Sequence, residues 1–378
     1  MEKIELGTIL HMEKGKKPIS QSKEIKDGYL PYVDIKAFEQ GVIDNYASTE
    51  KSLLCKDGDL LIVCDGSRSG LTGIAIKGIV GSTLSKISAD GLITKYLSYF
   101  IQSKYTLLNT QKKGTGTPHL KTEILKQSKL IVPSITIQEQ VVSHIEELFS
   151  ELDKAIETLC SLKEQLVLYR QIILMDAFKG IEKFRPVYQM SSVVTSGSRG
   201  WAQYYCDQGA LFIRIGNLTR KTINLDLSEV QHVNLPQKAE GLRTRLQAKD
   251  VLVSITADLG SIGFIPDSVD EAYVNQHIAM IRFLNPNQGR FMAWYLRSGF
   301  GQKDLLKNKR GEGKLGLGLD DIRNTKVPDV SDKKAKEIVT LIDIHMSICD
   351  IIEQTVFAAL DQAMIMKQSI LKQAFEGD

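Results

Sequence analysis

The sequence has few cysteines and no long apolar run. Its 378 residues contain five cysteines, none of them in a C-x-x-C pair, so it offers neither a zinc ligand set nor a disulfide framework and predicts reduced thiols. No apolar segment approaches the length of a membrane span. The first ten residues carry acidic side chains and lack the apolar core of a signal peptide. We therefore expect a cytoplasmic protein with no membrane partner and no metal site of its own.

Sequence motifs of catalysis are also missing. The chain has no phosphate-binding G-x-x-x-x-G-K-[ST] loop, no H-E-x-x-H, no G-x-S-x-G and no Asn-Pro-Pro-Tyr loop of a methyltransferase. The six histidines are isolated. His277 could serve as a ligand or a base, but such a histidine is more often a hydrogen-bonded structural residue. These absences favour a binding protein, and we expect no catalytic residue and no cofactor bound by this chain.

The small net charge is unevenly distributed. The formal charge of +3 divides into +5 over residues 1–136, −4 over 137–180, +5 over 181–331 and −3 over 332–378. Mildly basic segments thus alternate with acidic ones. This pattern indicates that the basic segments face a polyanion and that the acidic segments do not.

One stretch of sequence occurs twice. Residues 168–180 read LYRQIILMDAFKG and residues 365–377 read IMKQSILKQAFEG, with six identical positions at an offset of 197 residues. The chain is therefore expected to contain two copies of one unit. We divide it into a globular domain over 1–136, a helix over 137–180, a second domain over 181–331 and a C-terminal helix over 332–378.

Both expected helices have coiled-coil periodicity. Apolar residues recur every three or four positions from Ile145 to Ile173 and again from Ile338 to Ile370, and Thr136-Ile-Gln-Glu139 forms a capping-box pattern at the first start. About 40 residues give a helix of roughly 60 Å, which is long for a domain with a radius of gyration of about 14 Å. We therefore expect the two helices to bury each other rather than to pack separately. They should run antiparallel if a pseudo-two-fold axis relates the halves.

The globular halves contain further matching segments. Tyr32-Val-Asp-Ile35 resembles Phe212-Ile-Arg-Ile215, and Gly58-Asp-Leu-Leu-Ile-Val63 resembles Lys249-Asp-Val-Leu-Val-Ser254. Between these segments the halves differ strongly, which suggests one scaffold with two specificities. Their mixed strand and helix patterns, with the paired helices, predict an α+β fold with an internal pseudo-two-fold repeat.

Basic and polar glycine-rich loops occur at equivalent places in both halves. Lysine and arginine neutralise phosphates, while Arg, Asn, Ser and Thr read base edges. A single charged loop is more often a solvated face, but the repetition favours DNA binding. The candidate DNA-binding residues are Lys14, Lys16, Lys17, Ser67, Arg68, Ser69, Lys112, Lys113, Thr115 and Thr117 in the first half, and Ser198, Arg199, Trp201, Arg214, Asn217, Arg220, Lys221, Lys307, Lys309 and Arg310 in the second.

The whole chain resembles a known family, the specificity subunit of type I restriction-modification enzymes. The resemblance rests on the domain-helix-domain-helix layout, the Pro133, Glu139 and Gln140 pattern at the first helix start, the Lys-Gln-x-Ile-Leu-x-x-Ala-Phe-x-Gly helix ends, and the Tyr-Val-Asn-Gln-His-Ile-Ala stretch at 273–279. The second helix start departs from the pattern, because lysines replace Glu-Gln. That departure leaves the details of the junction open.

The resemblance implies a non-catalytic role in a larger complex. Each globular half would be a target recognition domain that reads one part of a split site in double-stranded DNA. The helices would form an antiparallel spacer that docks methyltransferase subunits, two of them, and restriction subunits would join through the complex. S-adenosylmethionine, ATP and Mg²⁺ would bind to the partner chains. A protein-interaction adaptor with two basic modules is the alternative, and a nuclease or methyltransferase in its own right comes third.

Overall fold

The protein divides into two compact units. The structure is a computed structural model that describes residues 2–111, 118–197, 199–235, 243–307, 309–310 and 316–376. Unit 1 consists of Met1–Cys160 and Phe357–Asp378, and unit 2 consists of Ser161–Val356. Each unit therefore contains one globular domain and a part of each long helix. Among the described residues, no helix combines the length and apolarity that crossing a membrane requires.

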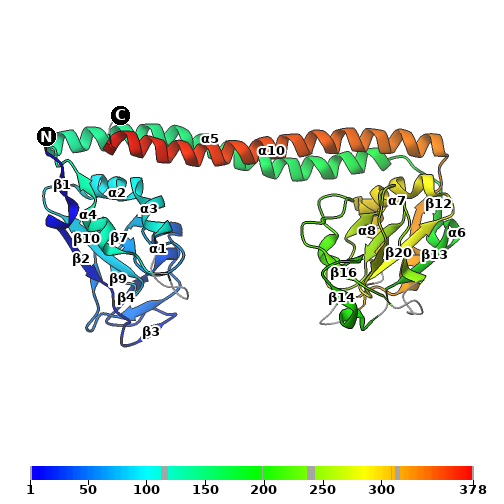
Figure 1. Ribbon diagram of the computed structural model, residues 1–378, viewed down its shortest axis with the longest axis horizontal. Coiled ribbons are helices and arrows are strands. Elements are labelled where there is room, and N and C mark those ends of the chain that lie inside the picture. Colours follow the sequence, from blue (N-terminus) through cyan, green and yellow to red (C-terminus); the bar gives the residue numbers. More distant parts are fainter. Residues whose placement is uncertain are drawn as a thin grey trace. The chain divides into compact units, whose positions relative to one another are not determined.

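The globular part of unit 1 is built on two small sheets and several short helices (Figure 1). The central strand of its first sheet reads Leu-Leu-Ile-Val and is buried at every position, as expected for a strand covered on both faces. The first sheet is antiparallel, in the order β2 (Leu10–Lys14), β10 (Leu84–Ala89), β7 (Leu60–Val63) and β8 (Thr72–Ile74). The second has the order β3 (Gln21–Ser22), β5 (Tyr46–Ser48), β4 (Tyr29–Val33), β9 (Gly78–Val80) and β6 (Leu54–Cys55). The remaining elements are the pair β1 (Ile4–Glu5) and β11 (Lys129–Leu130), and the helices α1 (Ile35–Gln40), α2 (Thr94–Ser103), α3 (Tyr105–Thr110) and α4 (Thr122–Gln127).

Unit 2 repeats this strand order, except that no described strand takes the place of β6 in its second sheet. Its first sheet is β13 (Ser191–Ser196), β20 (Ile278–Phe283), β17 (Val251–Ser254) and β18 (Ile262–Phe264). Its second is β14 (Tyr205–Cys206), β16 (Gln231–Val233), β15 (Ala210–Ile213) and β19 (Ala272–Val274). The parallel pair of β15 with β19 corresponds to that of β4 with β9, so the internal repeat extends through the globular parts. The other strands and α-helices are β12 (Phe184–Pro186), β21 (Lys326–Pro328), α6 (Val187–Met190), α7 (Gly289–Arg297), α8 (Gly299–Leu305) and α9 (Leu319–Asn324), and three short 3-10 helices are η2 (Trp201–Tyr204), η3 (Ile215–Asn217) and η5 (Pro286–Gln288).

A glycine follows the first strand of the first sheet in each unit. A Cβ atom on Gly15 would lie 2.3 Å from the carbonyl oxygen of Gly81, and one on Gly197 would lie 2.0 Å from that of Val274. Both distances are far below van der Waals contact. The chain therefore needs glycine at both positions. Gly15 follows β2 and lies against the residue after β9, and Gly197 follows β13 and lies against the last residue of β19.

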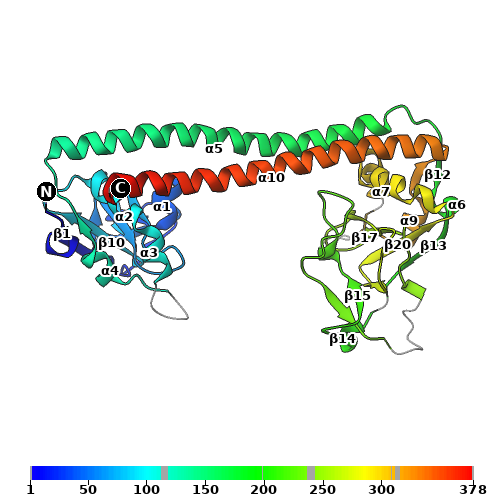
Figure 2. The same ribbon diagram turned by 45° about the horizontal axis from the view of Figure 1, so that its top comes forward.

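The two long helices pair in opposite directions, which confirms the antiparallel prediction. They are α5 (Ile135–Phe178) and α10 (Asp332–Glu376), and they lie side by side in both views (Figures 1 and 2). In unit 2 the Arg170 guanidinium donates to Asp350 at 2.7 Å. In unit 1 Lys367 forms an ion pair with Asp153. The partner number falls as the residue number rises, which is the signature of antiparallel helices.

The first long helix begins earlier than its capping-box pattern predicts. The amide of Gln138 donates to the Ser134 carbonyl at 3.0 Å, so Thr136 already lies inside the first turn and the predicted capping box is wrong. Instead, the buried Gln138 side chain holds the start in place. Its Nε2 donates to the carbonyl of Gly91 at 2.7 Å, and its Oε1 accepts from the amide of Ile93 at 2.9 Å.

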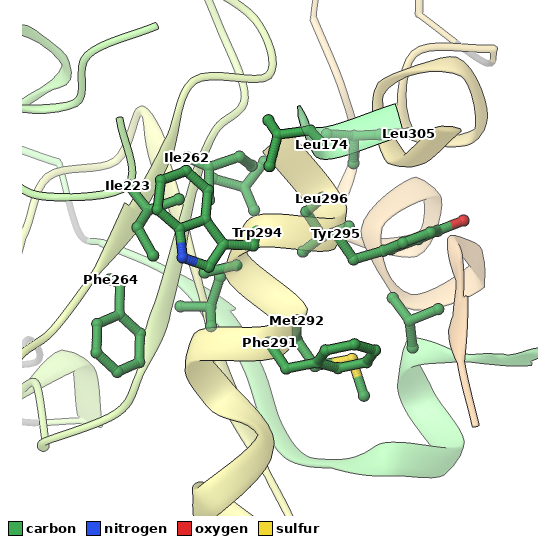
Figure 3. Packing of buried hydrophobic residues seen from close by; sticks show 14 of the residues in the cluster. Leu174, Ile223, Ile262, Phe264, Phe291, Met292, Trp294, Tyr295, Leu296 and Leu305 are labelled. Carbon is green, nitrogen blue, oxygen red and sulfur yellow. The ribbon is translucent and has the colours of Figure 1, made fainter. Parts of the chain in front are cut away.

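A phenylalanine near the end of α5 anchors the helix pair of unit 2 to its globular part. The Phe178 ring lies 5.5 Å from that of Phe291 and 5.3 Å from that of Tyr295, two residues of α7 shown in Figure 3. Phe178 shares one buried cluster with Ile338 and Ile342 of α10. The end of α5 thus lies at the start of α10, as antiparallel pairing requires.

The repeated phenylalanine does the same in unit 1. The Phe375 ring of α10 lies 5.0 Å from that of Tyr96 and 5.6 Å from that of Phe100, both on α2. Phe375 is only half-buried. The two copies thus use one residue in one place but bury it to different extents.

Candidate nucleic-acid interface

In unit 1 three polar side chains meet where β2 and β7 end. Lys14 is the last residue of β2, Asp65 follows β7, and His119 comes from the segment before α4. The Asp65 carboxylate accepts from Lys14 Nζ at 2.8 Å and from His119 Nδ1 at 2.7 Å. Partial burial alone would raise the pKa of Asp65, but these two hydrogen bonds hold it below its ordinary value. Asp65 therefore stays ionised and holds two exposed side chains, Lys14 and His119, at one edge of the sheet.

The equivalent edge of unit 2 carries different chemistry. The pairing of the sheet strands places Ser196 where unit 1 has Lys14. Thr256 follows β17 as Asp65 follows β7, and a backbone bridge joins it to Gly316 as one joins Asp65 to His119. One scaffold position is thus cationic in one unit and neutral in the other.

His277 completes the edge in unit 2. Its Nδ1 lies 2.7 Å from Thr256 Oγ1, and its Nε2 lies 2.9 Å from Gln276 Nε2. Its backbone amide donates to Asn275 Oδ1 at 3.1 Å. These contacts give His277 the hydrogen-bonded environment that its sequence context indicates.

A cavity of about 650 Å³ opens beside this edge. Arg214 lies in its wall directly after β15, with Asn275 and His277 on the opposite segment. The side chain of Arg214 is half-buried, and within the described part of the chain its guanidinium has no hydrogen-bond or ion-pair partner. Asp226 and Glu229 supply carboxylates to the same wall. The cavity therefore offers both donors and acceptors to a polar ligand.

The predicted DNA-binding residues fall into distinct environments. Ser67 is exposed at a turn, and its backbone carbonyl accepts from Asn109. Exposed cations are Lys16, Lys17, Arg199 and Lys309. Ion-paired cations are Lys14, Arg68 (with Glu39), Arg220 (with Asp258), Lys221 (with Glu353), Lys307 (with Asp304) and Arg310 (with Asp321). Lys112, Lys113, Thr115, Thr117 and Ser198 lie outside the described residues.

Three of the predicted residues, Ser69, Trp201 and Asn217, are buried and so differ from the exposed loop side chains that the sequence indicated. The Ser69 hydroxyl donates to the Gly66 carbonyl at 2.7 Å and is closed to solvent. The Trp201 indole stacks on Phe212 at 5.2 Å within a core cluster. The Asn217 amide closes a loop through backbone contacts, including its Oδ1 with the amide of Arg214 at 2.9 Å. These side chains pack inside unit 1 or unit 2 and hold the surrounding loops in place.

Sequence reasoning missed Asp65, His119 and Thr256. Asp65 and His119 are 54 positions apart, and no local pattern connects them. The one available signal was the match of Gly58–Val63 with Lys249–Ser254, which aligns the residues that follow each strand. Among the described residues there is no cluster of His, Cys, Asp and Glu that could hold a metal ion. The chemistry on offer is hydrogen bonding and charge.

Comparison with known proteins gives a consistent family. The family profile described as type I restriction modification DNA specificity domain matches residues 1–160 and 221–362. The MjaVIII type I restriction enzyme specificity subunit of Methanocaldococcus jannaschii is 25% identical, with 91% of this chain and 87% of the relative covered. The EcoBI specificity subunit of Escherichia coli is 20% identical, with 95% and 82% covered.

Solved structures share the fold. One, from a study of complex assembly and conformational transition of the type I R-M system, has a TM-score of 0.76 at 16% identity and covers 99% of this chain and 97% of that chain. The HsdS subunit from Thermoanaerobacter tengcongensis has a TM-score of 0.54 at 16% identity, with 100% and 97% covered. The profile alone covers well over half of the chain. The chain therefore belongs to the type I restriction-modification DNA specificity family, as a non-catalytic specificity subunit involved in DNA sequence recognition.

Proposed function

We propose that each unit reads one part of a bipartite site in double-stranded DNA, and that the helices dock two methyltransferase subunits. The observation that carries this proposal is the repeated strand order with different side chains at one equivalent edge, Lys14, Asp65 and His119 in unit 1 against Ser196 and Thr256 in unit 2. Two identical readers would recognise two identical half-sites. Divergence at the same place suits two different ones.

The two edges offer different recognition chemistry. In unit 1 Lys14 presents a cationic donor, which suits phosphate oxygens or the acceptor edge of guanine, and His119 keeps its Nε2 for a ligand. In unit 2 the half-buried Arg214 can form a bidentate pair with guanine. Exposed Lys16 and Lys17 in unit 1 and Arg199 in unit 2 would add contacts to the backbone phosphates.

Exposed apolar side chains on the helices support docking. Val167, Leu168 and Tyr169 on α5 are 59%, 58% and 43% exposed. The residues 197 positions later on α10, Met364, Ile365 and Met366, are 62%, 63% and 44% exposed. Apolar patches that recur at equivalent positions suit two copies of one partner.

The partners would supply the chemistry. Restriction subunits would join through the complex, and S-adenosylmethionine, ATP and Mg²⁺ would bind on partner chains. This chain would recognise the DNA sequence and hold the partner subunits in position on it.

Mapping methylated sites tests the proposal. The chain is co-expressed with its methyltransferase partner, and methylation is mapped across the host genome for wild type, Lys14→Met, Arg214→Met and the control Lys154→Met, a change on an exposed helix position. Lys14→Met should relax or weaken recognition in one part of the site and Arg214→Met in the other. If either change altered both parts together, or if Lys154→Met had the same effect, independent reading would be wrong.

Direct binding separates the proposal from the adaptor alternative. Affinity for a duplex containing the mapped site should fall steeply between 50 and 200 mM salt, because phosphate contacts release counterions. Loss of one guanine contact at Arg214 should cost about 1–3 kcal/mol for the cognate duplex only. Salt-independent binding, or equal loss on all sequences, would contradict base reading by Arg214.

A further inference from the structure

A second cavity, of about 580 Å³, lies in unit 2 between the helix pair and the α7–α8 segment. Its apolar wall comes from the long helices and includes Leu166, Leu174 and Met346. Its polar wall includes Arg220, Lys221 and Arg297. The cavity is thus apolar on one side and cationic on the other.

Three of the cations at this cavity, Arg170, Arg220 and Lys221, pair with three carboxylates. Arg170 pairs with Asp350 at 2.7 Å and with Glu353 at 3.0 Å. Lys221 also forms an ion pair with Glu353, at 2.5 Å. Arg220 forms an ion pair with Asp258, at 2.6 Å. Arg297 lines the same cavity and takes part in none of these pairs.

Arg297 lacks any hydrogen-bond or ion-pair partner within the described residues. Its Nε–H is closed to solvent and donates to no acceptor. Burial, and secondarily the positive charge of Arg220, lower the pKa of the guanidinium. A buried donor without a partner costs about 1–3 kcal/mol, and more when it is charged. An anion bound beside Arg297 would supply the missing acceptor and remove this cost.

The position in unit 1 that corresponds to Arg297 carries no charge. The ion pair of Lys95 with Glu146 corresponds to that of Arg290 with Asp343, and this register places Gln102 of α2 where α7 has Arg297. Gln102 is neutral, and its Nε2 donates to the Ser98 hydroxyl at 3.0 Å. The unpaired cation is therefore a property of unit 2 alone.

We propose that this cavity binds the phosphate group of a free small molecule, with Arg297 as its principal contact. A guanidinium offers paired donors that match phosphate oxygens, and Arg220 and Lys221 line the same wall. The apolar wall accommodates an apolar portion of the ligand. This site uses no residue of the Lys14–Asp65–His119 edge or of the Ser196–Thr256 edge, although Arg220 and Lys221 belong to the DNA-binding candidates of the sequence.

Inorganic phosphate is the probe for the test. Titration calorimetry and thermal unfolding of the full chain are followed against added phosphate at constant ionic strength in a buffer without other oxyanions. Wild type should bind saturably and gain thermal stability. Arg297→Gln, which installs the residue of unit 1, should weaken binding by at least about tenfold, as expected for the loss of a charge-assisted contact. It should also raise the melting temperature without phosphate.

A matched control and a second variant keep the test decisive. Gln102→Met, the change at the equivalent position of unit 1, should leave phosphate binding unchanged. Lys221→Met should weaken binding while Arg297 is retained, which covers the case in which the first variant does not fold. Absence of saturable binding to wild type, or equal binding by Arg297→Gln, would overturn the proposal. The proposal would also be overturned if Arg297→Gln weakened the binding of duplex DNA but left phosphate binding unchanged, because Arg297 would then be a DNA contact.

Discussion

Removing the repeated phenylalanine at its two positions should destabilise the two units separately. Phe178 is 4% exposed and packs on two aromatic rings at 5.5 and 5.3 Å. Replacing a buried phenylalanine with alanine costs about 3–5 kcal/mol through lost burial and the cavity left behind. Phe375 makes two similar ring contacts but is only half-buried. We therefore expect Phe178→Ala to cost about 3–4 kcal/mol and Phe375→Ala roughly half as much.

The chain contains its own unit-specific probe. Both tryptophans, Trp201 and Trp294, belong to unit 2. Tryptophan fluorescence during urea unfolding therefore reports unit 2, while far-ultraviolet circular dichroism reports both units. With a urea dependence of about 2 kcal/mol per molar, Phe178→Ala should lower the fluorescence midpoint by about 1.5–2 M. Phe375→Ala should shift only the part of the dichroism signal that tryptophan does not follow.

Two results would refute this reasoning. If Phe375→Ala moved the fluorescence midpoint as far as Phe178→Ala, the units would unfold as one and the division would have no energetic meaning. If Phe178→Ala moved it by less than about 0.5 M, the ring contacts would contribute far less than their burial implies.

Three further predictions concern single sites. The pKa of Asp65 lies below its ordinary value, so its ion pairs stabilise the fold above about pH 4 and that stability is lost as pH falls further; Asp65→Asn should flatten acid unfolding followed by circular dichroism. In the folded chain at pH 8, a thiol reagent should modify exposed Cys160 first and half-buried Cys206 more slowly, while the three buried thiols react only after unfolding; rapid modification of all five would contradict the burial. Gly197→Ala should lower the melting temperature strongly because its Cβ would meet a carbonyl oxygen at 2.0 Å, whereas Gly299→Ala, with nothing within 4 Å, should change it little; equal shifts would show that the close approach relaxes.

The long helices and the duplication could be predicted from the sequence because both leave local signals. Heptad spacing records which face of a helix is buried, and the repeated block around Phe178 and Phe375 records the duplication in identical letters. The antiparallel pairing followed from those two signals together. The start of α5 could not be predicted in the same way, because the Gln138 side chain that holds it donates a hydrogen bond to a loop more than forty residues earlier in the chain.

Tertiary structure decided which polar residues can reach a ligand. Ser69, Trp201 and Asn217 read as loop residues beside glycines, but packing buries all three. Asp65 and His119 were invisible as a pair, because a strand end and a distant segment meet only in the folded sheet. Sequence determined where helices lie and that the unit is repeated, since periodicity and repetition are local. Exposure and partnership depend on segments brought together from far apart, and only the fold specifies those.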